Sequence, residues 1–271
     1  MTFVFGWHIF QSTWKDSSGI KVSFLDVGQG DAILLSSGNI QVLIDGGPNP
    51  KILLDRLRQE MPYNDRHIEM VIATHPDADH IGGFSELMPV YEIGLVGETN
   101  TEKDTAVYRA WRTNLETYTT PRKVFSWGDR FVFPNGAVVN ILHPSGKIKE
   151  AEKDINKASL VLFLEYGAQS FLFTGDLPGE QESFLDVSNV DVLKVAHHGS
   201  KSSTTENFLE KIHPIDAIIS VGNDNKYGHP DSDILKRLEE RDVRIVRTDV
   251  SGTITYYCKN EFDSCQIRVR R

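Results

Sequence analysis

A short apolar run followed at once by four metal-capable side chains constrains this chain more than any other feature. The chain runs Met70-Val71-Ile72-Ala73-Thr74 and then His75-Pro76-Asp77-Ala78-Asp79-His80. A buried strand has this apolar character, and imidazole and carboxylate groups directly beyond it are suitable metal ligands. The pattern therefore predicts a metal site at the edge of a sheet. A polar loop is the alternative interpretation, because Asp, His and Pro are ordinary loop residues.

Three later motifs repeat the arrangement of reactive side chains beyond an apolar run. They are Thr174-Gly175-Asp176, His197-His198-Gly199-Ser200 and Tyr227-Gly228-His229-Pro230. Reactive groups in layered α/β folds usually lie just past the carboxyl ends of strands, where neighbouring strands bring them together. We therefore expect the four motifs to meet at one edge. As an alternative, Asp176 alone is also a sound helix N-cap.

The order of apolar patterns indicates one α/β domain over residues 20–271. Residues 1–19 are expected to be an extension or a strand, or the end of a membrane segment in a longer parent chain. Residues 123–142 are expected to be rich in strands. We predict further strands at 21–26, 32–36, 40–45, 68–74, 93–96, 159–165, 170–173, 190–196, 217–221, 243–246, 253–257 and 266–269, and helices at 50–59, 84–90, 105–118, 179–185, 204–211 and 232–240.

The net charge of −9 argues against a protein that holds nucleic acid by diffuse electrostatics. It does not exclude a phosphate substrate, because two divalent cations would place positive charge where a phosphate binds. The segment Gly28-Gln29-Gly30-Asp31 lacks the third glycine of a dinucleotide-binding turn, and the chain has neither a phosphate-binding loop nor a nucleophile elbow. We therefore expect no nucleotide cofactor and no serine hydrolase.

The two cysteines, Cys258 and Cys265, flank a turn-like segment between two strand patterns. Facing positions in a hairpin allow a disulfide, which is typical of an oxidising compartment. Two free thiols are an equally good interpretation of the sequence.

Taken as a set, these motifs resemble the metallo-β-lactamase superfamily. The stretches Phe24 to Ala32, Thr74 to Gly83, Leu193 to Lys201 and Tyr227 to Pro230 more closely resemble the C-terminal metallo-β-lactamase-like domain of the ComEC family of DNA-uptake proteins. The first stretch also resembles related phosphorylcholine esterases. The resemblance implies a four-layer αββα sandwich and a centre for two divalent metal ions.

The resemblance also implies how the ligands divide between the ions. One ion would lie at His75 and Asp77, a second at Asp79, His80 and His197, and Asp176 would bridge the two. Asp77 stands where many members of the superfamily have His, and Asn156 stands where another His is common. Oxygen ligands suit Mn²⁺ better than imidazoles do, so Mn²⁺ is the expected metal, with Zn²⁺ able to bind.

Several residues beside the expected metals could contact substrate or orient ligands. Since adjacent residues past a strand point in different directions, we expect His197 to bind metal and His198 to contact phosphate or support a ligand. Ser200 and Lys201 suit phosphate contact, although a helix cap explains them equally. His229 is a candidate general acid or phosphate ligand. Asp31 and Asp45 are candidate acceptors for ring N–H groups of ligand histidines.

The leading prediction is a metal-dependent phosphodiesterase, a nuclease of exonuclease type that degrades DNA, with single-stranded DNA favoured. Asp79, Asp176 and His229 would be the catalytic residues. One alternative is a hydrolase of small phosphodiesters or lactones, and another is a DNA-guiding domain without catalysis. The resemblance implies a soluble domain on the outer face of the cytoplasmic membrane that degrades the strand not imported, with the membrane channel of a parent chain or complex as partner. A free-standing soluble protein is the alternative.

Overall fold

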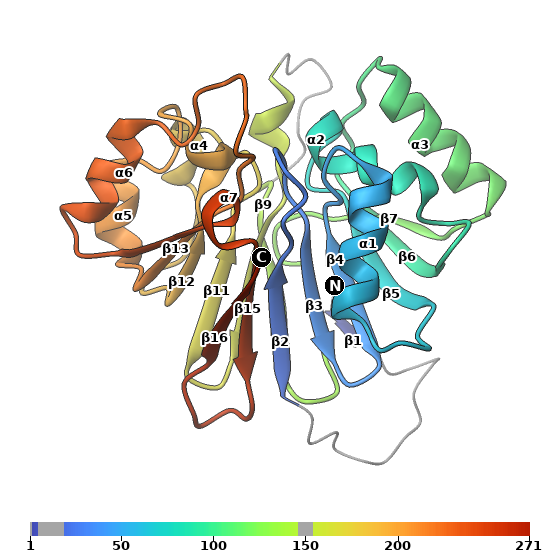
Figure 1. The fold of residues 1–271 in the computed structure, drawn as a ribbon, viewed down its shortest axis with the longest axis horizontal. Helices are drawn as coiled ribbons and strands as arrows, with labels where there is room; N and C mark the ends of the chain where they lie inside the picture. Colours follow the sequence, from blue (N-terminus) through green and yellow to red (C-terminus); the bar gives the residue numbers. More distant parts are fainter. Residues whose placement is uncertain (1, 5–18, 146–153) are drawn as a thin grey trace.

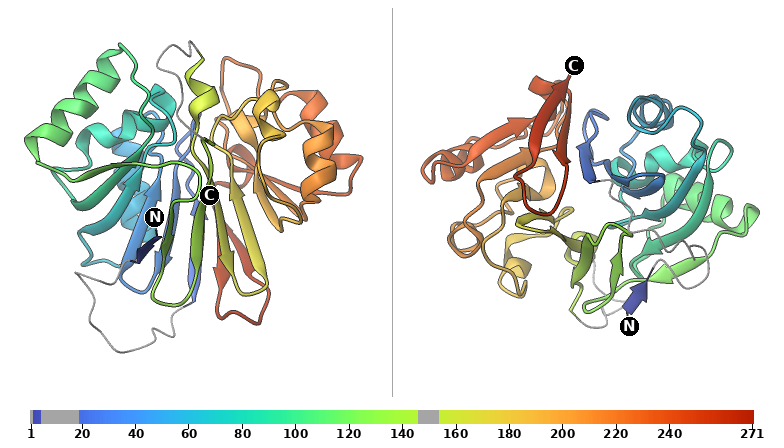
Figure 2. Two further views of the ribbon diagram at one scale, coloured as in Figure 1. Left: turned by 180° about the vertical axis from the view of Figure 1, so that it is seen from behind. Right: turned by 90° about the horizontal axis from the view of Figure 1, so that it is seen from below.

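Two β-sheets packed face to face form the centre of the protein, and helices cover their outer faces (Figure 1). The computed structural model describes residues 2–4, 19–145 and 154–271. Within these residues each sheet has eight strands. The arrangement is the four-layer αββα sandwich that the sequence predicts, and Figure 2 shows it from behind and from below.

The first sheet combines an antiparallel half with a parallel half. Strands β16, β15, β2, β3 and β4 pair antiparallel, whereas β4, β5, β6 and β7 pair parallel. In spatial order the strands are β16 (Gln266–Arg270), β15 (Thr253–Cys258), β2 (Ile20–Phe24), β3 (Ile33–Ser37), β4 (Ile40–Ile44), β5 (His67–Ile72), β6 (Glu92–Glu98) and β7 (Arg122–Val124).

The second sheet also ends in a parallel half, formed by β11 to β14. Its edge strand β1 contains residues 2–4, whereas residues 1 and 5–18 of the expected N-terminal extension lie outside the described residues. In spatial order the strands are β1 (Thr2–Val4), β8 (Arg130–Val132), β9 (Val138–His143), β10 (Val161–Tyr166), β11 (Gln169–Phe173), β12 (Val192–Lys194), β13 (Asp216–Ile219) and β14 (Arg244–Arg247).

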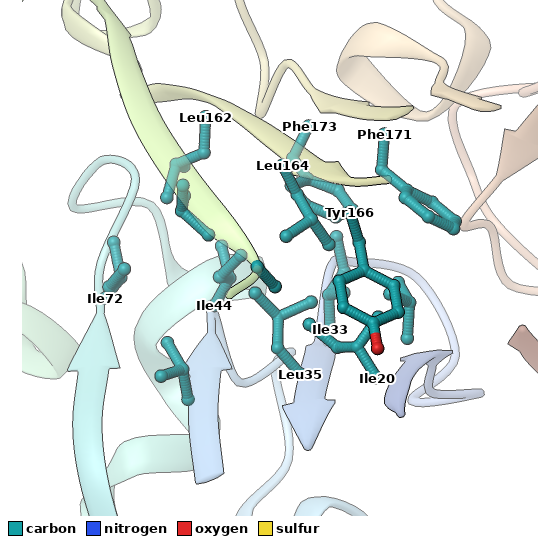
Figure 3. Packing of buried hydrophobic residues seen from close by; sticks show 14 of the residues in the cluster. Ile20, Ile33, Leu35, Ile44, Ile72, Leu162, Leu164, Tyr166, Phe171 and Phe173 are labelled. Atoms are coloured by element: carbon teal, nitrogen blue, oxygen red, sulfur yellow. The ribbon is translucent and has the colours of Figure 1, made fainter. Parts of the chain in front are cut away.

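Three apolar clusters hold the four layers together. The central cluster lies between the sheets and joins residues such as Ile44 and Ile72 to Leu162 and Phe173 (Figure 3). The outer clusters pack α1 (Pro50–Glu60) and α3 (Ala106–Thr117) on the first sheet, and α5 (Glu206–Ile212) and α6 (Ser232–Glu239) on the second. Burial of such apolar side chains is the main contribution to the stability of a fold of this kind.

The helical segments differ from the predicted ones mainly at the sheet edge. The expected helix at 84–90 is a 3-10 helix, η1 (Gly82–Glu86), which directly continues α2 (Ala78–Ile81). The remaining short segments are α4 (Gly179–Glu182), α7 (Thr248–Ser251), η2 (Ile155–Ala158) and η3 (Ala196–Gly199). The expected strand at 190–196 is shorter, because the chain turns into η3 after Lys194.

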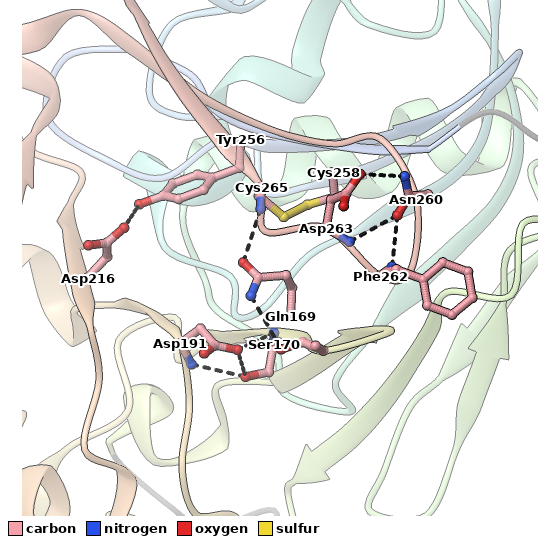
Figure 4. The surroundings of a disulfide bond; sticks show 11 residues. Gln169, Ser170, Asp191, Asp216, Tyr256, Cys258, Asn260, Phe262, Asp263 and Cys265 are labelled. Carbon is pink, nitrogen blue, oxygen red and sulfur yellow. Dashed lines mark hydrogen bonds between the residues drawn. A yellow bond between two sulfur atoms is a disulfide. The ribbon is translucent and has the colours of Figure 1, made fainter.

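The structure joins Cys258 and Cys265 in a disulfide at the turn between β15 and β16 (Figure 4). The backbone N–H of Cys265 donates to the side-chain carbonyl of Gln169 at the start of β11, so this hairpin also contacts the second sheet. Nearby, the Tyr256 hydroxyl donates to Asp216 on β13. Among the described residues, the helices are too short or too polar to cross a bilayer.

Candidate metal centre

The carboxyl ends of the central strands bring the four motifs to one edge of the two sheets. Strand β5 ends at Ile72 and is followed by His75 and Asp77, and α2 then carries Asp79 and His80. The chain holds this segment by backbone hydrogen bonds to its neighbours, from the Gly46 N–H to the His80 carbonyl and from the Asp31 N–H to the Asp79 carbonyl.

The second sheet supplies the facing half of the cluster. Asp176 follows β11 in a tight turn at Gly175, whose φ of +51° is favourable for glycine. His197 and His198 follow β12 within η3. The His197 N–H donates to the Gly175 carbonyl at 3.1 Å, which fixes the two turns to each other. Side chains more than 90 residues apart in the sequence therefore share one site.

The carboxylate of Asp176 lies between two sets of side chains. Its Oδ2 atom is 3.8 Å from His75 Nε2 and 3.6 Å from His197 Nε2. Its Oδ1 atom is 3.2 Å from His80 Nε2 and 3.7 Å from His198 Nε2. A carboxylate with one oxygen toward each set has the geometry that bridges two cations.

Two further aspartates complete the two sets. Asp77 Oδ2 lies 3.9 Å from His75 Nε2, and Asp79 Oδ2 lies 3.4 Å from His198 Nε2. Each set thus offers two imidazoles and two carboxylates, with Asp176 common to both. Asn156 lies on η2, three residues before Ser159, whose hydroxyl accepts a hydrogen bond from the Asp176 N–H.

The two adjacent histidines differ from their expected placement. We expected His197 beside Asp79 and His80 with His198 outside, but His198 lies in that position and His197 faces the other oxygen of Asp176. The expectation assumed an extended backbone in which successive side chains alternate. Both residues instead have left-handed φ angles, 51° at His197 and 56° at His198. This turn directs both rings toward the same carboxylate.

Several polar atoms at the centre of the cluster are buried without a hydrogen-bond partner. They are the Nε2 atoms of His75, His80 and His198 and the Oδ1 atom of Asp176. Buried polar atoms are nearly always satisfied, so four unsatisfied ones that face a common point indicate a missing ligand. Overlapping groups of three donors, among them His75–His80–Asp176 and Asp79–His80–His198, have ligand atoms within 4.8 Å of one another, and these donor types suit divalent cations. The residues present therefore fit the metal pair that the sequence predicts.

A surrounding layer of acceptors fixes the orientation of the histidine rings. Asp45 Oδ2 lies 2.8 Å from His80 Nδ1 and also accepts from the Thr74 hydroxyl, so the expected role of Asp45 is confirmed. His198 Nδ1 lies 3.0 Å from the Ser220 carbonyl and 3.3 Å from Asp31 Oδ1. Such contacts leave the Nε2 atoms of His80 and His198 directed toward Asp176, where they could bind metal.

Two lysines that the sequence analysis did not select contact the acidic residues of the site. Lys194 is completely buried and pairs with Asp31, while Lys103 pairs with Asp77 at the rim. Lysine is rarely buried unless it is paired with an acidic group. Lys194 within the apolar strand β12 was therefore a usable sequence signal of a buried acidic partner. Lys103 lies in a polar loop after β6, where nothing in the sequence distinguishes it.

The electrostatics of the cluster act in opposite directions on its imidazoles. Burial and the neighbouring His80 lower the pKa of His75 to about 4. Burial also disfavours charge on His80 and His198, but Asp176 outweighs it, raising the pKa of His80 well above its usual value and that of His198 to about 9. Burial opposes ionisation of Asp176, yet His80 and His198 hold its pKa well below the usual range. Divalent cations must therefore displace protons from His80 and His198, because a metal needs the neutral imidazole.

The other predicted residues lie around this centre. The ring of His229 is 6.0 Å from that of His197, and burial together with His197 lowers the pKa of His229. Ser200 is buried with its hydroxyl 2.9 Å from that of Ser202, and Lys201 is exposed.

Comparison with protein families identifies this architecture. The sequence profile of the Metallo-beta-lactamase superfamily matches residues 25–222, which contain every candidate metal ligand. The chain belongs to this superfamily. The chain is therefore a protein of the metallo-hydrolase fold, and its candidate ligands lie on both sides of the Asp176 carboxylate.

Three curated relatives are bacterial proteins much longer than this chain. ComE operon protein 3 of Bacillus subtilis (strain 168) is 32% identical over 90% of this chain and 34% of its own length. Recombination protein 2 of Haemophilus influenzae is 31% identical over 89% of this chain and 28% of its own. Competence protein ComA of Neisseria gonorrhoeae is 27% identical over 87% and 32%. The chain thus spans about a third of the relatives it matches.

A solved structure supports the fold independently. The metallo-beta-lactamase fold protein YhfI from Bacillus subtilis superposes with a TM-score of 0.59 at 12% identity, over 87% of this chain and 99% of its own. At this identity the likeness concerns the fold alone, and it agrees with the αββα arrangement of the two sheets.

Proposed function

We propose that this chain is a metal-dependent phosphodiesterase that cleaves DNA, with single-stranded DNA as the preferred substrate. The observation that carries this proposal is the pair of ligand sets on opposite oxygens of Asp176. Two divalent ions in such an arrangement supply an activated water and stabilise the attacking and leaving oxygens of a phosphoryl transfer. DNA as the substrate rests on the similarity to a competence protein and to a recombination protein.

The charge of the site favours a phosphodiester over a neutral ester. The carboxylates exceed the paired lysines, Lys103 and Lys194, by three, so two divalent cations would leave one net positive charge. A phosphodiester carries one negative charge, which neutralises the remaining positive charge of the site, whereas a lactone carries no charge. The carboxylates counted are those of Asp31, Asp45, Asp77, Asp79 and Asp176.

The residues of the chain have distinct proposed roles in this reaction. His75, Asp77 and His197 would hold one cation, and Asp79, His80 and His198 the other, with Asp176 shared. His229, beside His197, would donate a proton to the leaving oxygen or contact the phosphate. Lys201, exposed on the turn after His198, would attract the phosphate backbone of the strand.

Cleavage of labelled single-stranded DNA with Mn²⁺ tests the proposal directly. We expect linear strands to be degraded and Asp79→Ala to abolish degradation. A closed circular single strand resists an exonuclease, so its survival would support an end-dependent enzyme. Equal cleavage by the wild type and Asp79→Ala would refute the proposal. Turnover of bis(p-nitrophenyl) phosphate without any cleavage of DNA would instead favour a small-phosphodiester hydrolase.

Manganese is proposed as the activating metal, because carboxylates form half of the donors in each set. Chelated protein would be reloaded with Mn²⁺, Mg²⁺ or Zn²⁺ and assayed on the same strand. Maximal turnover with Zn²⁺ and none with Mn²⁺ would reject this assignment.

The proposed context is a domain of a DNA-uptake membrane protein, exposed on the outer face of the cytoplasmic membrane. The similarity to about a third of each longer relative and the Cys258–Cys265 disulfide support this placement. There the domain would act on the strand that is not imported, with the membrane channel as its partner. Protease accessibility of the domain in intact protoplasts would test the placement, and protection from the protease would refute it.

A further inference from the structure

The loop after β13 carries an exposed aromatic ring beside the metal centre. Tyr227 is 56% exposed, and its ring stacks on that of His229 with centroids 5.9 Å apart and planes 15° apart. The His229 ring in turn lies 6.0 Å from that of His197, which faces Asp176. Three rings therefore extend from the centre of the cluster to the solvent.

This loop is held in place rather than loosely attached. The Asn225 side chain accepts a hydrogen bond from the His229 N–H and donates to the carbonyls of His229 and Gly222. The Gly222 N–H donates to the side-chain carbonyl of Gln29, which lies on the loop between β2 and β3. These contacts join the loop to the first sheet, so Tyr227 has a defined position relative to the ligands.

We propose that Tyr227 and His229 form a stacking subsite for the unpaired nucleobase next to the phosphate that is cleaved. This inference rests on the proposed phosphodiesterase function and names its substrate class. An exposed aromatic ring beside a phosphate-binding centre is the arrangement by which proteins hold single-stranded nucleic acid without reading its sequence. A base in a duplex is stacked on its neighbours and is not free to occupy such a subsite.

The charge beside the ring selects a nucleobase over a cationic headgroup. Lys226 Nζ lies 5.2 Å from the Tyr227 ring centroid, where it occupies the position of a cation–π partner. A choline group would therefore meet a like charge at this ring. A nucleotide has a neutral base and an anionic phosphate. Its base can stack on the Tyr227 ring, and its phosphate is attracted to Lys226. The subsite accordingly fits a nucleotide and disfavours a choline phosphate.

Two chromogenic diesters that differ in the nucleobase test the subsite. They are thymidine 5′-(p-nitrophenyl phosphate) and methyl p-nitrophenyl phosphate. Because stacking of one base contributes about 1–3 kcal/mol, we expect Tyr227→Ala to raise KM for the thymidine ester at least about fivefold. Tyr227→Ala should raise KM for the methyl ester less than KM for the thymidine ester, and Tyr227→Phe should keep the wild-type preference for the thymidine ester. The control is Tyr63→Ala, which removes another exposed tyrosine, 89% accessible, from the loop before β5.

Equal effects of Tyr227→Ala on the two esters, or no effect on either, would overturn the subsite while leaving the hydrolase intact. If the wild type cleaves neither ester and degrades no DNA, the proposed function fails and binding decides the subsite. Fluorescence anisotropy would then compare labelled oligothymidine with an abasic strand of equal length. Tighter binding of oligothymidine that disappears in Tyr227→Ala, but not in Tyr63→Ala, would support the subsite. Equal binding of the two strands would refute it.

Discussion

Replacing Lys194 by methionine should destabilise the protein more than any exchange of a surface lysine. Lys194 is completely buried on β12 and pairs with Asp31, which is 2% exposed, and it also donates to the Gly175 carbonyl at 3.3 Å. The Lys194→Met variant keeps the length of the side chain and removes its charge. Asp31 is then left buried without its main counter-charge, beside the rings of His198 and His80.

The structure allows two magnitudes for this loss. Burial opposes ionisation of Asp31, but Lys194 and His198 lower its pKa from 3.8 to about 2, which corresponds to about 2 kcal/mol. Breaking a buried pair by removing one partner typically costs about 3–5 kcal/mol. Because His198 remains as a partial counter-charge, we expect a loss near the lower end, about 3 kcal/mol. The stability from Asp31 is present above pH 3.8 and is lost as the pH falls toward 2, so pH 7 is a suitable condition.

Urea unfolding at pH 7 with a chelator measures this loss. We expect the melting temperature to fall by about 6–12 °C as well. The double variant Lys194→Met with Asp31→Asn should recover at least about 1 kcal/mol relative to the sum of the single variants, since the two groups are coupled. The control Lys236→Met removes a lysine from an exposed pair with Glu240 and should change stability little. A loss below about 1 kcal/mol in Lys194→Met, or strict additivity in the double variant, would refute the reasoning.

Three further predictions concern the rim, the protons and the disulfide. Lys103→Gln should raise the affinity for Mn²⁺ up to about fivefold in calorimetry, because Lys103 competes with the cation for Asp77 and is 37% exposed. Unchanged or weaker binding would contradict this. Because the pKa of His198 is raised to about 9, Mn²⁺ must displace a proton from this ring at pH 7. The affinity for Mn²⁺ should therefore rise about tenfold per pH unit for each proton displaced, and the calorimetric enthalpy should depend on the buffer. Equal affinity at pH 6 and pH 8 would contradict this. The double variant Cys258→Ala and Cys265→Ala lacks the cross-link between two positions seven apart in the sequence. It should therefore lose about 2 kcal/mol in urea unfolding, and an unchanged stability would contradict this.

Much of the fold follows from the order of apolar runs and turn residues. Strands such as β5 and β11 are short apolar segments bounded by polar turns, so their existence is predictable. The apolar spacing of residues 84–90 fits an α-helix or a 3-10 helix, so the sequence predicts a helix there but not its type. In the structure the 3-10 helix η1 packs against α1 and α3. Pairing of β1 with β8 joins distant segments, and no local pattern contains that information.

The site was predictable in its residue types but not in its detailed geometry. The hexapeptide His75 to His80 and Asp176 are recognisable as candidates because each follows an apolar strand. The placement of both His197 and His198 beside Asp176 was not predictable, because it depends on left-handed backbone angles that non-glycine residues seldom adopt. Such angles cost free energy and persist where surrounding contacts enforce them, as the Gly175 carbonyl does for His197.

The division of the ligands between the two sheets has a mechanical consequence. His75 and Asp79 belong to the first half of the chain, whereas Asp176 and His198 belong to the second. A cation held by both halves ties them together, and binding that is confined to the folded state adds about 4 kcal/mol when the metal concentration is a thousand times Kd. A chain cleaved between β9 and β10 would therefore hold metal only while its two halves stay associated, so a bound cation would favour that association.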